Sequence, residues 1–203
     1  RHMNKAPDHI KRVTVYASSS NGLADEYYEA AARLGTVLGR AGLEVVYGGG
    51  GVGLMGAMAD TALAEGAHVH GVIPGCLNTV EHGHQDLPRL DVVADMRERK
   101  QRMIENSDAV ISLPGGSGTL EELFEVITLK RLGQFLGPII LLNTRAYYER
   151  LNVFMANAVD ERFMSDRHLQ MWSLVNEPEQ VLRAMHDAAE WGEDACEFAA
   201  VRN

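Results

Sequence analysis

The sequence predicts an α/β fold: a Rossmann-like, open and mainly parallel sheet with helices on both faces. Short apolar runs alternate along the chain with segments whose apolar residues recur at helical spacing, which is typical of repeated βαβ units. The strand-like runs, such as residues 109–113 and 138–142, are apolar throughout and do not alternate with polar residues. Strands of this kind belong to sheets that helices cover on both sides.

Each expected element follows from its local pattern. β-branched and aromatic residues at 13–16 predict a strand, and the apolar positions of 25–41, followed by Gly42, predict a helix. By the same reasoning, further strands are expected over 43–47, 67–73, 90–93, 109–113, 138–142 and 172–175. Further helices are expected over 54–64, 96–106, 118–132, 147–159 and 178–191. Residues 76–90 have no regular pattern, and the chain from residue 192 onward is expected to be frayed.

The composition excludes several classes of protein. A chain of 203 residues that is 46% hydrophobic and 23% charged is typical of one globular domain. Its net charge of −9 argues against nucleic acid as a partner, because nucleic-acid binding needs a basic face. No apolar run approaches the ~18 residues that span a bilayer, so no membrane partner is expected. The polar N-terminal stretch does not resemble a signal peptide, and the lone cysteines Cys76 and Cys196 fit reduced thiols in a cytoplasmic protein.

Loops rich in small residues follow the first two expected strands. Ser18 and Ser19 carry hydroxyls that can donate hydrogen bonds to a ligand, although local bonds to the backbone would explain them equally well. Gly49 and Gly50 belong to a glycine run whose backbone can approach a ligand closely. The run contains a GxGxxG pattern, but the next expected strand ends in Ile73 and a proline with no acid there. We therefore disfavour an NAD or FAD site.

The third loop, residues 114–122, is the most specific motif. An apolar strand leads into proline, three glycines, a threonine and two acids that open a helix. Gly115, Gly116 and Gly118 can expose backbone N–H groups suited to a phosphate, and Thr119 can add a hydroxyl. The loop lacks the lysine of a triphosphate-binding P-loop. One of the two acids, Glu121 or Glu122, is explained by the preference for acids in a first helical turn, and the other could hold a carboxylate against a sugar.

A charged helix upstream supplies a candidate arginine. Residues 96–103 read equally as a solvated helix face with an i, i+4 ion pair, but this helix leads directly into the strand before the third loop. It could therefore turn one arginine toward the same crevice.

The glycine turn, the segment 71–74, the pair Arg99–Lys100 and the motif at 114–122 together resemble the Lonely Guy family of cytokinin riboside 5′-monophosphate phosphoribohydrolases. The family was formerly described as lysine decarboxylases. The resemblance implies hydrolysis of the N-glycosidic bond of a purine nucleoside 5′-monophosphate. The products would be the free base and ribose 5-phosphate. Plain adenosine monophosphate and its N6-substituted cytokinin relatives both remain possible substrates.

The resemblance also implies roles for individual residues. Arg99 and Glu122 would form the catalytic pair. The residues expected to bind substrate or phosphate are Gly115, Gly116, Ser117, Gly118, Thr119, Ser18, Ser19, Gly49, Gly50, Met96 and Lys100. The family assembles as homodimers or larger homo-oligomers, with the partner subunit near the active site. On this interpretation residues 13–191 form a single nucleotide-binding catalytic domain, residues 1–12 a tag remnant and tail, and residues 192–203 a C-terminal tail.

Two competing interpretations remain. The main alternative is a non-catalytic nucleotide-binding or carrier protein on the same fold, and a lysine decarboxylase is the weaker one because no lysine has a recognisable pyridoxal phosphate setting. No cofactor is expected. His82 and His84 next to Glu81 look like part of a chelate, but the loop is expected to be exposed and lacks a third ligand, so we expect no metal. His68 and His70 are expected to be core or packing residues.

Overall fold

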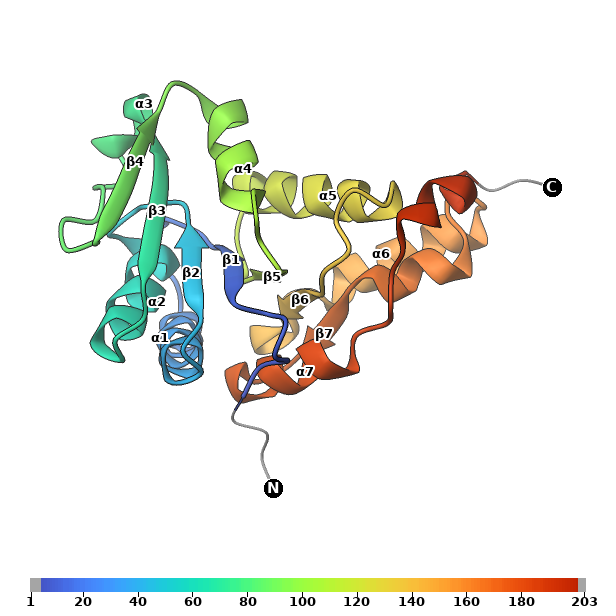
Figure 1. Cartoon of the computed structure of the whole chain (residues 1–203), viewed down its shortest axis with the longest axis horizontal. Coiled ribbons are helices and arrows are strands. Elements are labelled where there is room, and N and C mark those ends of the chain that lie inside the picture. The colour runs from blue at the N-terminus through green and yellow to red at the C-terminus, as the bar shows by residue number, and fades with distance from the viewer. Residues whose placement is uncertain (1–4, 201–203) are drawn as a thin grey trace.

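The computed structural model describes residues 5–200, so the expected tag remnant, residues 1–3, lies outside the described part. A seven-stranded parallel sheet with the order β4-β3-β2-β1-β5-β6-β7 forms the centre of the molecule (Figure 1). The strands are β1 (Arg12–Tyr16), β2 (Glu44–Tyr47), β3 (Val69–Pro74), β4 (Arg89–Val93), β5 (Ala109–Ser112), β6 (Ile139–Leu142) and β7 (Ser173–Val175). The predicted fold class is confirmed, and each of the seven expected strands is present to within two residues at its ends.

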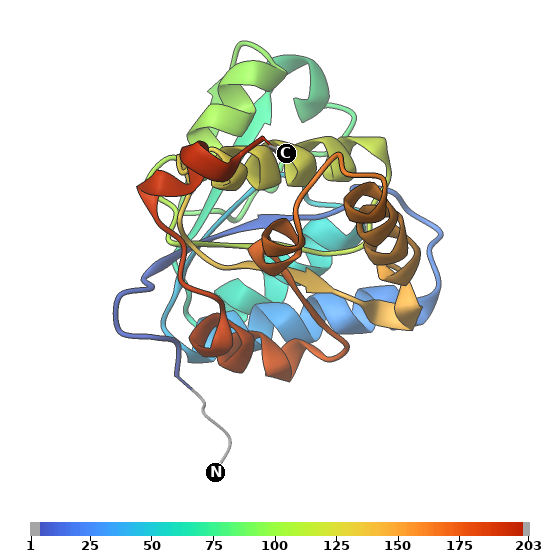
Figure 2. The same ribbon diagram turned by 90° about the vertical axis from the view of Figure 1, so that its right-hand side faces the viewer.

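The helices α1 to α6 connect successive strands, α7 follows the last strand, and together they cover both faces of the sheet (Figure 2). They are α1 (Asp25–Arg40), α2 (Gly53–Ala64), α3 (Gly75–Asn78), α4 (Met96–Ile104), α5 (Ser117–Arg131), α6 (Glu149–Asp160) and α7 (Val181–Asp187). Short 3-10 helices cover Thr144–Ala146, Asp166–Met171, Pro178–Gln180 and Glu193–Phe198. Among the described residues, no helix is long and apolar enough to cross a membrane.

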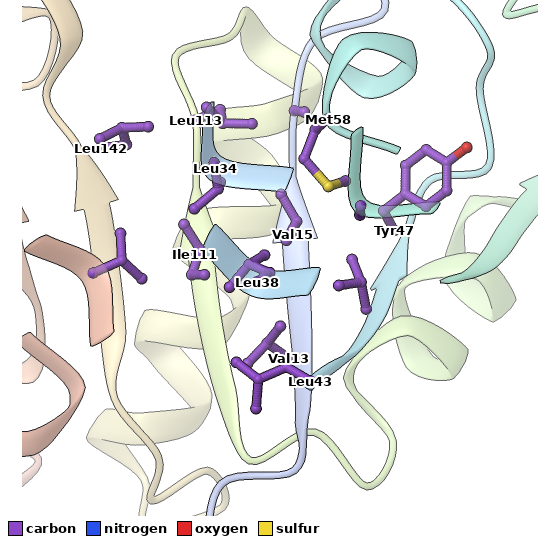
Figure 3. Close-up of a cluster of buried hydrophobic side chains, with 14 of the residues drawn as sticks. Val13, Val15, Leu34, Leu38, Leu43, Tyr47, Met58, Ile111, Leu113 and Leu142 are labelled. Atoms are coloured by element: carbon purple, nitrogen blue, oxygen red, sulfur yellow. The ribbon is translucent and has the colours of Figure 1, made fainter. Parts of the chain in front are cut away.

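The core is divided into two layers by the sheet. Val13 and Val15 of β1 point into one layer, with Leu34 and Leu38 of α1 (Figure 3), whereas Tyr16 points into the other. The first layer is completed by α2 and α7, and the second by α4, α5 and α6. Successive side chains of a strand point to opposite faces, so a strand covered by helices on both sides must be apolar throughout. This explains the apolar runs of the sequence.

Two expectations about the C-terminal part of the fold need correction. The last helix was expected over 178–191, but α7 ends at Asp187 because the chain becomes extended at Ala188. It then brings Trp191 to α5, where its indole N–H donates to the carbonyl of Lys130 at 2.6 Å. The segment from residue 192, expected to be frayed, forms a 3-10 helix with Ala195 fully buried.

The histidine pair was predicted only half correctly. His70 is buried, and its Nε2 lies 3.0 Å from a carboxylate oxygen of Asp91, whereas His68 is exposed. His68 precedes β3 and so lies outside the covered part of the sheet.

The strand order places one crevice at the carboxyl edge of the sheet. β1 is flanked by β2 on one side and by β5 on the other, and the connections that follow β1 and β5 lead to helices on opposite faces of the sheet. In open parallel sheets, ligands bind at such a switch point. The serine loop after β1 and the glycine loop after β5 therefore meet where a ligand site is expected.

Candidate active site

A cavity of about 290 Å³ lies at this switch point. Most of the predicted site residues line it, although they come from three separate segments of the chain. They are Ser18, Ser19, Met96, Arg99, Gly116, Ser117, Gly118, Thr119 and Glu122. The structure thus brings together the serine loop, the start of α4 and the start of α5.

The amino end of α5 forms one wall of the cavity. Gly116 caps the helix without a side-chain hydrogen bond, and the first backbone bond runs from Leu120 N to Gly116 O at 3.0 Å. The amides of residues 117–119 precede that bond, so they have no partner within the helix. Together with the positive end of the helix dipole, they are suited to an anion such as a phosphate.

Gly115 shapes this wall from behind. Its carbonyl accepts a hydrogen bond from the hydroxyl of Tyr147 at 2.6 Å. A Cβ atom at position 115 would lie only 2.1 Å from Oγ1 of Thr119, so a residue larger than glycine would displace the Thr119 side chain. Gly115 therefore allows the loop to fold tightly against the first turn of α5.

Glu122 projects into the cavity one turn beyond these amides. Its side chain is 5% exposed. Burial raises the pKa of Glu122 to about 8; the positive charge of Arg99 opposes this shift and the negative charge of Glu81 adds to it. A carboxyl group with a pKa near neutrality can exchange protons at physiological pH, which is the property that a general base or acid requires.

Arg99 also lines the cavity, and hydrogen bonds hold its guanidinium in place. It is 2% exposed, and its Nε donates to the carbonyl of Val72 at 3.0 Å. Its Nη2 donates to the carbonyl of Gly48 at 2.6 Å and to the Glu81 carboxylate at 2.8 Å. A Cβ atom at Gly48 would lie 2.4 Å from Nη2, so the glycine is needed to admit the guanidinium. The glycine turn therefore positions an arginine.

The remaining predicted residues lie outside the cavity lining. Gly49 and Gly50 lie behind it, where the turn is bonded to the loop that carries Glu81. The α2 amides that follow this turn are also used within the protein, since Leu54 N donates to Ser18 O at 2.9 Å. Lys100 forms ion pairs with the carboxylates of Glu121 and Glu125, and the Glu121 contact contributes most to raising its pKa.

Glu81 is the charged residue of the cavity lining that was not predicted from the sequence; Ala17, Ser20, Met55 and Leu77 also line the cavity. Glu81 was considered only as a neighbour of the two histidines, in a loop expected to be exposed. In the structure Glu81 is 9% exposed, lines the cavity and pairs with Arg99. His84 is also buried, with Nε2 at 2.7 Å from Asp60, whereas His82 is exposed. An acid in an irregular polar segment gives no periodic signal, so only the fold could have revealed it.

The histidine loop does not form a metal centre within the described part of the chain. No group of three or more His, Cys, Asp or Glu side chains there is arranged to hold a metal ion.

A larger hollow, of about 930 Å³, lies elsewhere, between Glu105–Asp108, Gly137 and Trp191. Residues 105–108 and 137 precede β5 and β6, so this hollow lies at the amino edge of the sheet, opposite the switch point. It contains none of the predicted site residues. The position of the candidate site therefore rests on its chemistry and not on the size of the cavity.

The fold and this cavity define a class: an α/β protein in which the amino end of a helix, a buried carboxyl group and an arginine line one cavity at the switch point of the sheet. A family profile described as "possible lysine decarboxylase" matches residues 55–185. A cytokinin riboside 5′-monophosphate phosphoribohydrolase of Arabidopsis thaliana is 45% identical over 163 residues, which cover 80% of this chain and 75% of that protein. A probable enzyme of the same name from Oryza sativa subsp. japonica is 41% identical over 176 residues, 87% of this chain and 70% of that protein.

The chain therefore belongs to the Lonely Guy family, to which the "possible lysine decarboxylase" profile corresponds. Solved structures agree with the fold. The molybdenum cofactor binding protein of Rippkaea orientalis matches with a TM-score of 0.65 at 20% identity, covering 89% of this chain and 98% of that one. The molybdenum cofactor carrier protein of Chlamydomonas reinhardtii matches with a TM-score of 0.67 at 16% identity, with the same coverage. At these identities the likeness concerns the fold alone.

Proposed function

We propose that this protein hydrolyses the N-glycosidic bond of adenosine 5′-monophosphate or of its N6-substituted cytokinin relatives. The products are the free base and ribose 5-phosphate. The observation that carries this proposal is that Glu122 and Arg99 line the same cavity as the free amides of α5. The relatives named above carry the same activity in their names, which supports the assignment.

The 5′-phosphate binds at the amino end of α5. The amides of Ser117, Gly118 and Thr119 donate to its oxygens, and the hydroxyls of Ser18 and Ser19 approach from the β1 loop. A phosphate fixed there orients the ribose along the first turns of α5. Because Glu122 lies about one turn further on, its carboxyl group then faces the anomeric carbon.

The reaction separates the base from the sugar. The bond between C1′ and the base nitrogen breaks, its electron pair leaves with the base, and positive charge develops on the ribose. The ionised Glu122 carboxylate stabilises that charge and accepts a proton from the water that attacks C1′, as carboxylates do in other glycoside hydrolyses. The departing base then takes up the proton that Glu122 accepted from water, so the free base leaves neutral and the carboxylate is regenerated.

Arg99 contributes by orientation and electrostatics. A guanidinium keeps its proton in folded proteins, so it does not serve as the proton donor. Its Nε and Nη2 are fixed by two backbone carbonyls and a carboxylate, which leaves Nη1 on the side of Met96 at the cavity. A positive charge held there stabilises the electron-rich base as it leaves.

The buried carboxyl group argues against the alternative of a non-catalytic nucleotide carrier. In a carrier, an acid near the ribose would act in its ionised form, by accepting hydrogen bonds from the sugar hydroxyls. Burial instead raises the pKa of Glu122 to about 8, which suits a group that must take up and release a proton.

The test is to measure base release from AMP and from isopentenyladenosine monophosphate side by side. We expect free base and ribose 5-phosphate in equal amounts, and the ratio of the two rates identifies the preferred substrate. Glu122→Gln should abolish turnover while AMP binding stays within about threefold, because the missing interaction acts in the transition state. The matched control is Glu121→Gln, which removes the neighbouring acid that contacts Lys100, and it should retain most of the turnover. Binding of AMP without any release of base by the wild type would support the carrier.

We further propose a homodimer or larger homo-oligomer in the cytoplasm. Val153 and Phe154 of α6 and the nearby Phe163 are all more than 60% exposed, which is unusual for a free surface. Cys76 and Cys196 are free and exposed, which supports a reducing compartment.

A further inference from the structure

We propose that Glu81 is a positioning residue of this active site: its carboxylate fixes the guanidinium of Arg99 and balances its charge beside Glu122. This inference rests on the proposed function and adds a third residue to it. The sequence motif and the family resemblance that it carries point to Arg99 and Glu122, whereas Glu81 is identified by its place in the fold.

The first argument is the geometry of the arginine. Of its three nitrogen atoms, Nε binds the carbonyl of Val72 and Nη2 binds both the carbonyl of Gly48 and Oε2 of Glu81. The two carbonyls are fixed by the sheet, but neither carries a charge. Glu81 is the one acid that forms an ion pair with Arg99 in the described part of the chain, and both side chains are nearly inaccessible to solvent.

The second argument is the way in which the chain supports Glu81. The loop that carries it is bonded to the glycine turn through its backbone, with Gly51 N donating to His82 O at 2.7 Å and His84 N donating to Gly49 O at 2.9 Å. The hydroxyl of Ser19 also lies 3.4 Å from Oε1 of Glu81. An irregular segment is thus held at a fixed place, and Glu81 connects the serine loop to α4.

The third argument is electrostatic. The charged and titratable groups that act on Glu122 are Arg99, Lys100, Glu81 and Glu121, with Tyr16 next to them in the second core layer. Lys100 is paired with Glu121 and Glu125, and Arg99 is paired with Glu81. Neither cation beside Glu122 is therefore left without an acid partner. Without Glu81, the full positive charge of Arg99 would lower the pKa of Glu122 and make it a weaker base.

The test compares Glu81→Gln with the wild type in the base-release assay. Gln keeps the size of the side chain and one hydrogen bond to Arg99 but removes the charge. We expect kcat to fall by about a hundredfold while KM changes less than about threefold, because a displaced Arg99 affects the transition state and not phosphate binding. We also expect the acid limb of the pH profile of kcat/KM to move to lower pH, which a purely structural role would not cause.

Two further variants make the result decisive. Glu65→Gln removes the acid from an exposed ion pair with Arg40, and it should leave both kcat and the pH profile unchanged. Glu81→Asp keeps the charge at a shorter reach, so it should lower kcat with the acid limb unmoved, and it serves as the test if Glu81→Gln does not fold. The inference is overturned if Glu81→Gln, or Glu81→Asp in its place, has wild-type kcat. It is also overturned if the acid limb of the pH profile of kcat/KM does not move in Glu81→Gln. An inactive wild type would instead contradict the proposed function itself.

Discussion

At the scale of single residues, the site combines a buried acid with a buried arginine. Glu122 is costly to the protein because burial disfavours its ionised form. The same cost raises its basicity to the range where proton transfer at neutral pH is efficient. Destabilised residues of this kind are a feature of active sites, where stability is exchanged for activity.

This property predicts the pH dependence of catalysis. If ionised Glu122 is the active form, kcat/KM should rise with pH through an apparent pKa near 8, since this parameter reports the free enzyme. Initial rates at low AMP concentration between pH 6 and 9.5 measure it. A rate that falls over the same range would assign Glu122 the role of proton donor.

The same shift predicts a stabilising substitution. The folded-state pKa of Glu122 is raised from 4.5 to about 8, so its contribution to stability is present below pH 4.5 and is lost as the pH rises through 8. The Glu122→Gln variant has no ionisable group at this position, so it does not lose stability as the pH rises. We expect the variant to be more stable than the wild type by on the order of 2–4 kcal/mol at pH 9, and by little at pH 4.5. Thermal unfolding at both values checks this, and equal unfolding temperatures at pH 9 would contradict the burial of a charge.

Some residues of the candidate site could be predicted from the sequence, and one charged residue could not. Glu122 and Arg99 could be predicted because each lies at a fixed place in a recognisable motif, on a regular helix. The family resemblance supplied their roles. Glu81 could not be predicted, because it lies in a segment without periodicity and reaches the cavity only through backbone bonds to the glycine turn.

At the scale of elements, the amino end of α5 is the feature on which substrate binding depends. The motif at 114–122 predicted both the strand-to-helix turn and the free amides, and α5 begins one residue before the expected position. The glycine turn after β2 was interpreted as a ligand-binding loop because glycine-rich turns have that role in many nucleotide-binding folds. The structure shows why pattern alone is insufficient: Gly48 makes room for Arg99, which comes from another element.

The tight loop before α5 predicts the effect of one methyl group added at Gly115. Gly115→Ala places a carbon against Oγ1 of Thr119 and so displaces that side chain from the first turn of α5. We expect KM for AMP to rise by about tenfold or more, because one phosphate-binding interaction is worth about 1.5 kcal/mol or more. The control is Gly75→Ala, whose new carbon would meet only Val92 at an ordinary 3.8 Å. Unchanged KM in Gly115→Ala would show that the phosphate binds elsewhere.

At the scale of the whole molecule, the strand order creates the site. Alternation of apolar strands and helices was enough to predict a parallel sheet covered on both faces, because that architecture imposes the pattern. The position of the switch point, between β1 and β5, could be found only from the order of the strands in the sheet. The C-terminal segment was predicted poorly for a related reason: the contact of Trp191 with α5 joins parts of the chain that are far apart in sequence.

The central claim is that a phosphate at the amino end of α5 places the anomeric carbon opposite Glu122. The most direct measurement is a crystal structure of the Glu122→Gln variant with AMP bound. We predict phosphate oxygens within hydrogen-bonding distance of the amides of residues 117–119, and C1′ facing the side chain at position 122. A nucleotide bound with its phosphate away from these amides, or with its ribose turned from residue 122, would contradict the account.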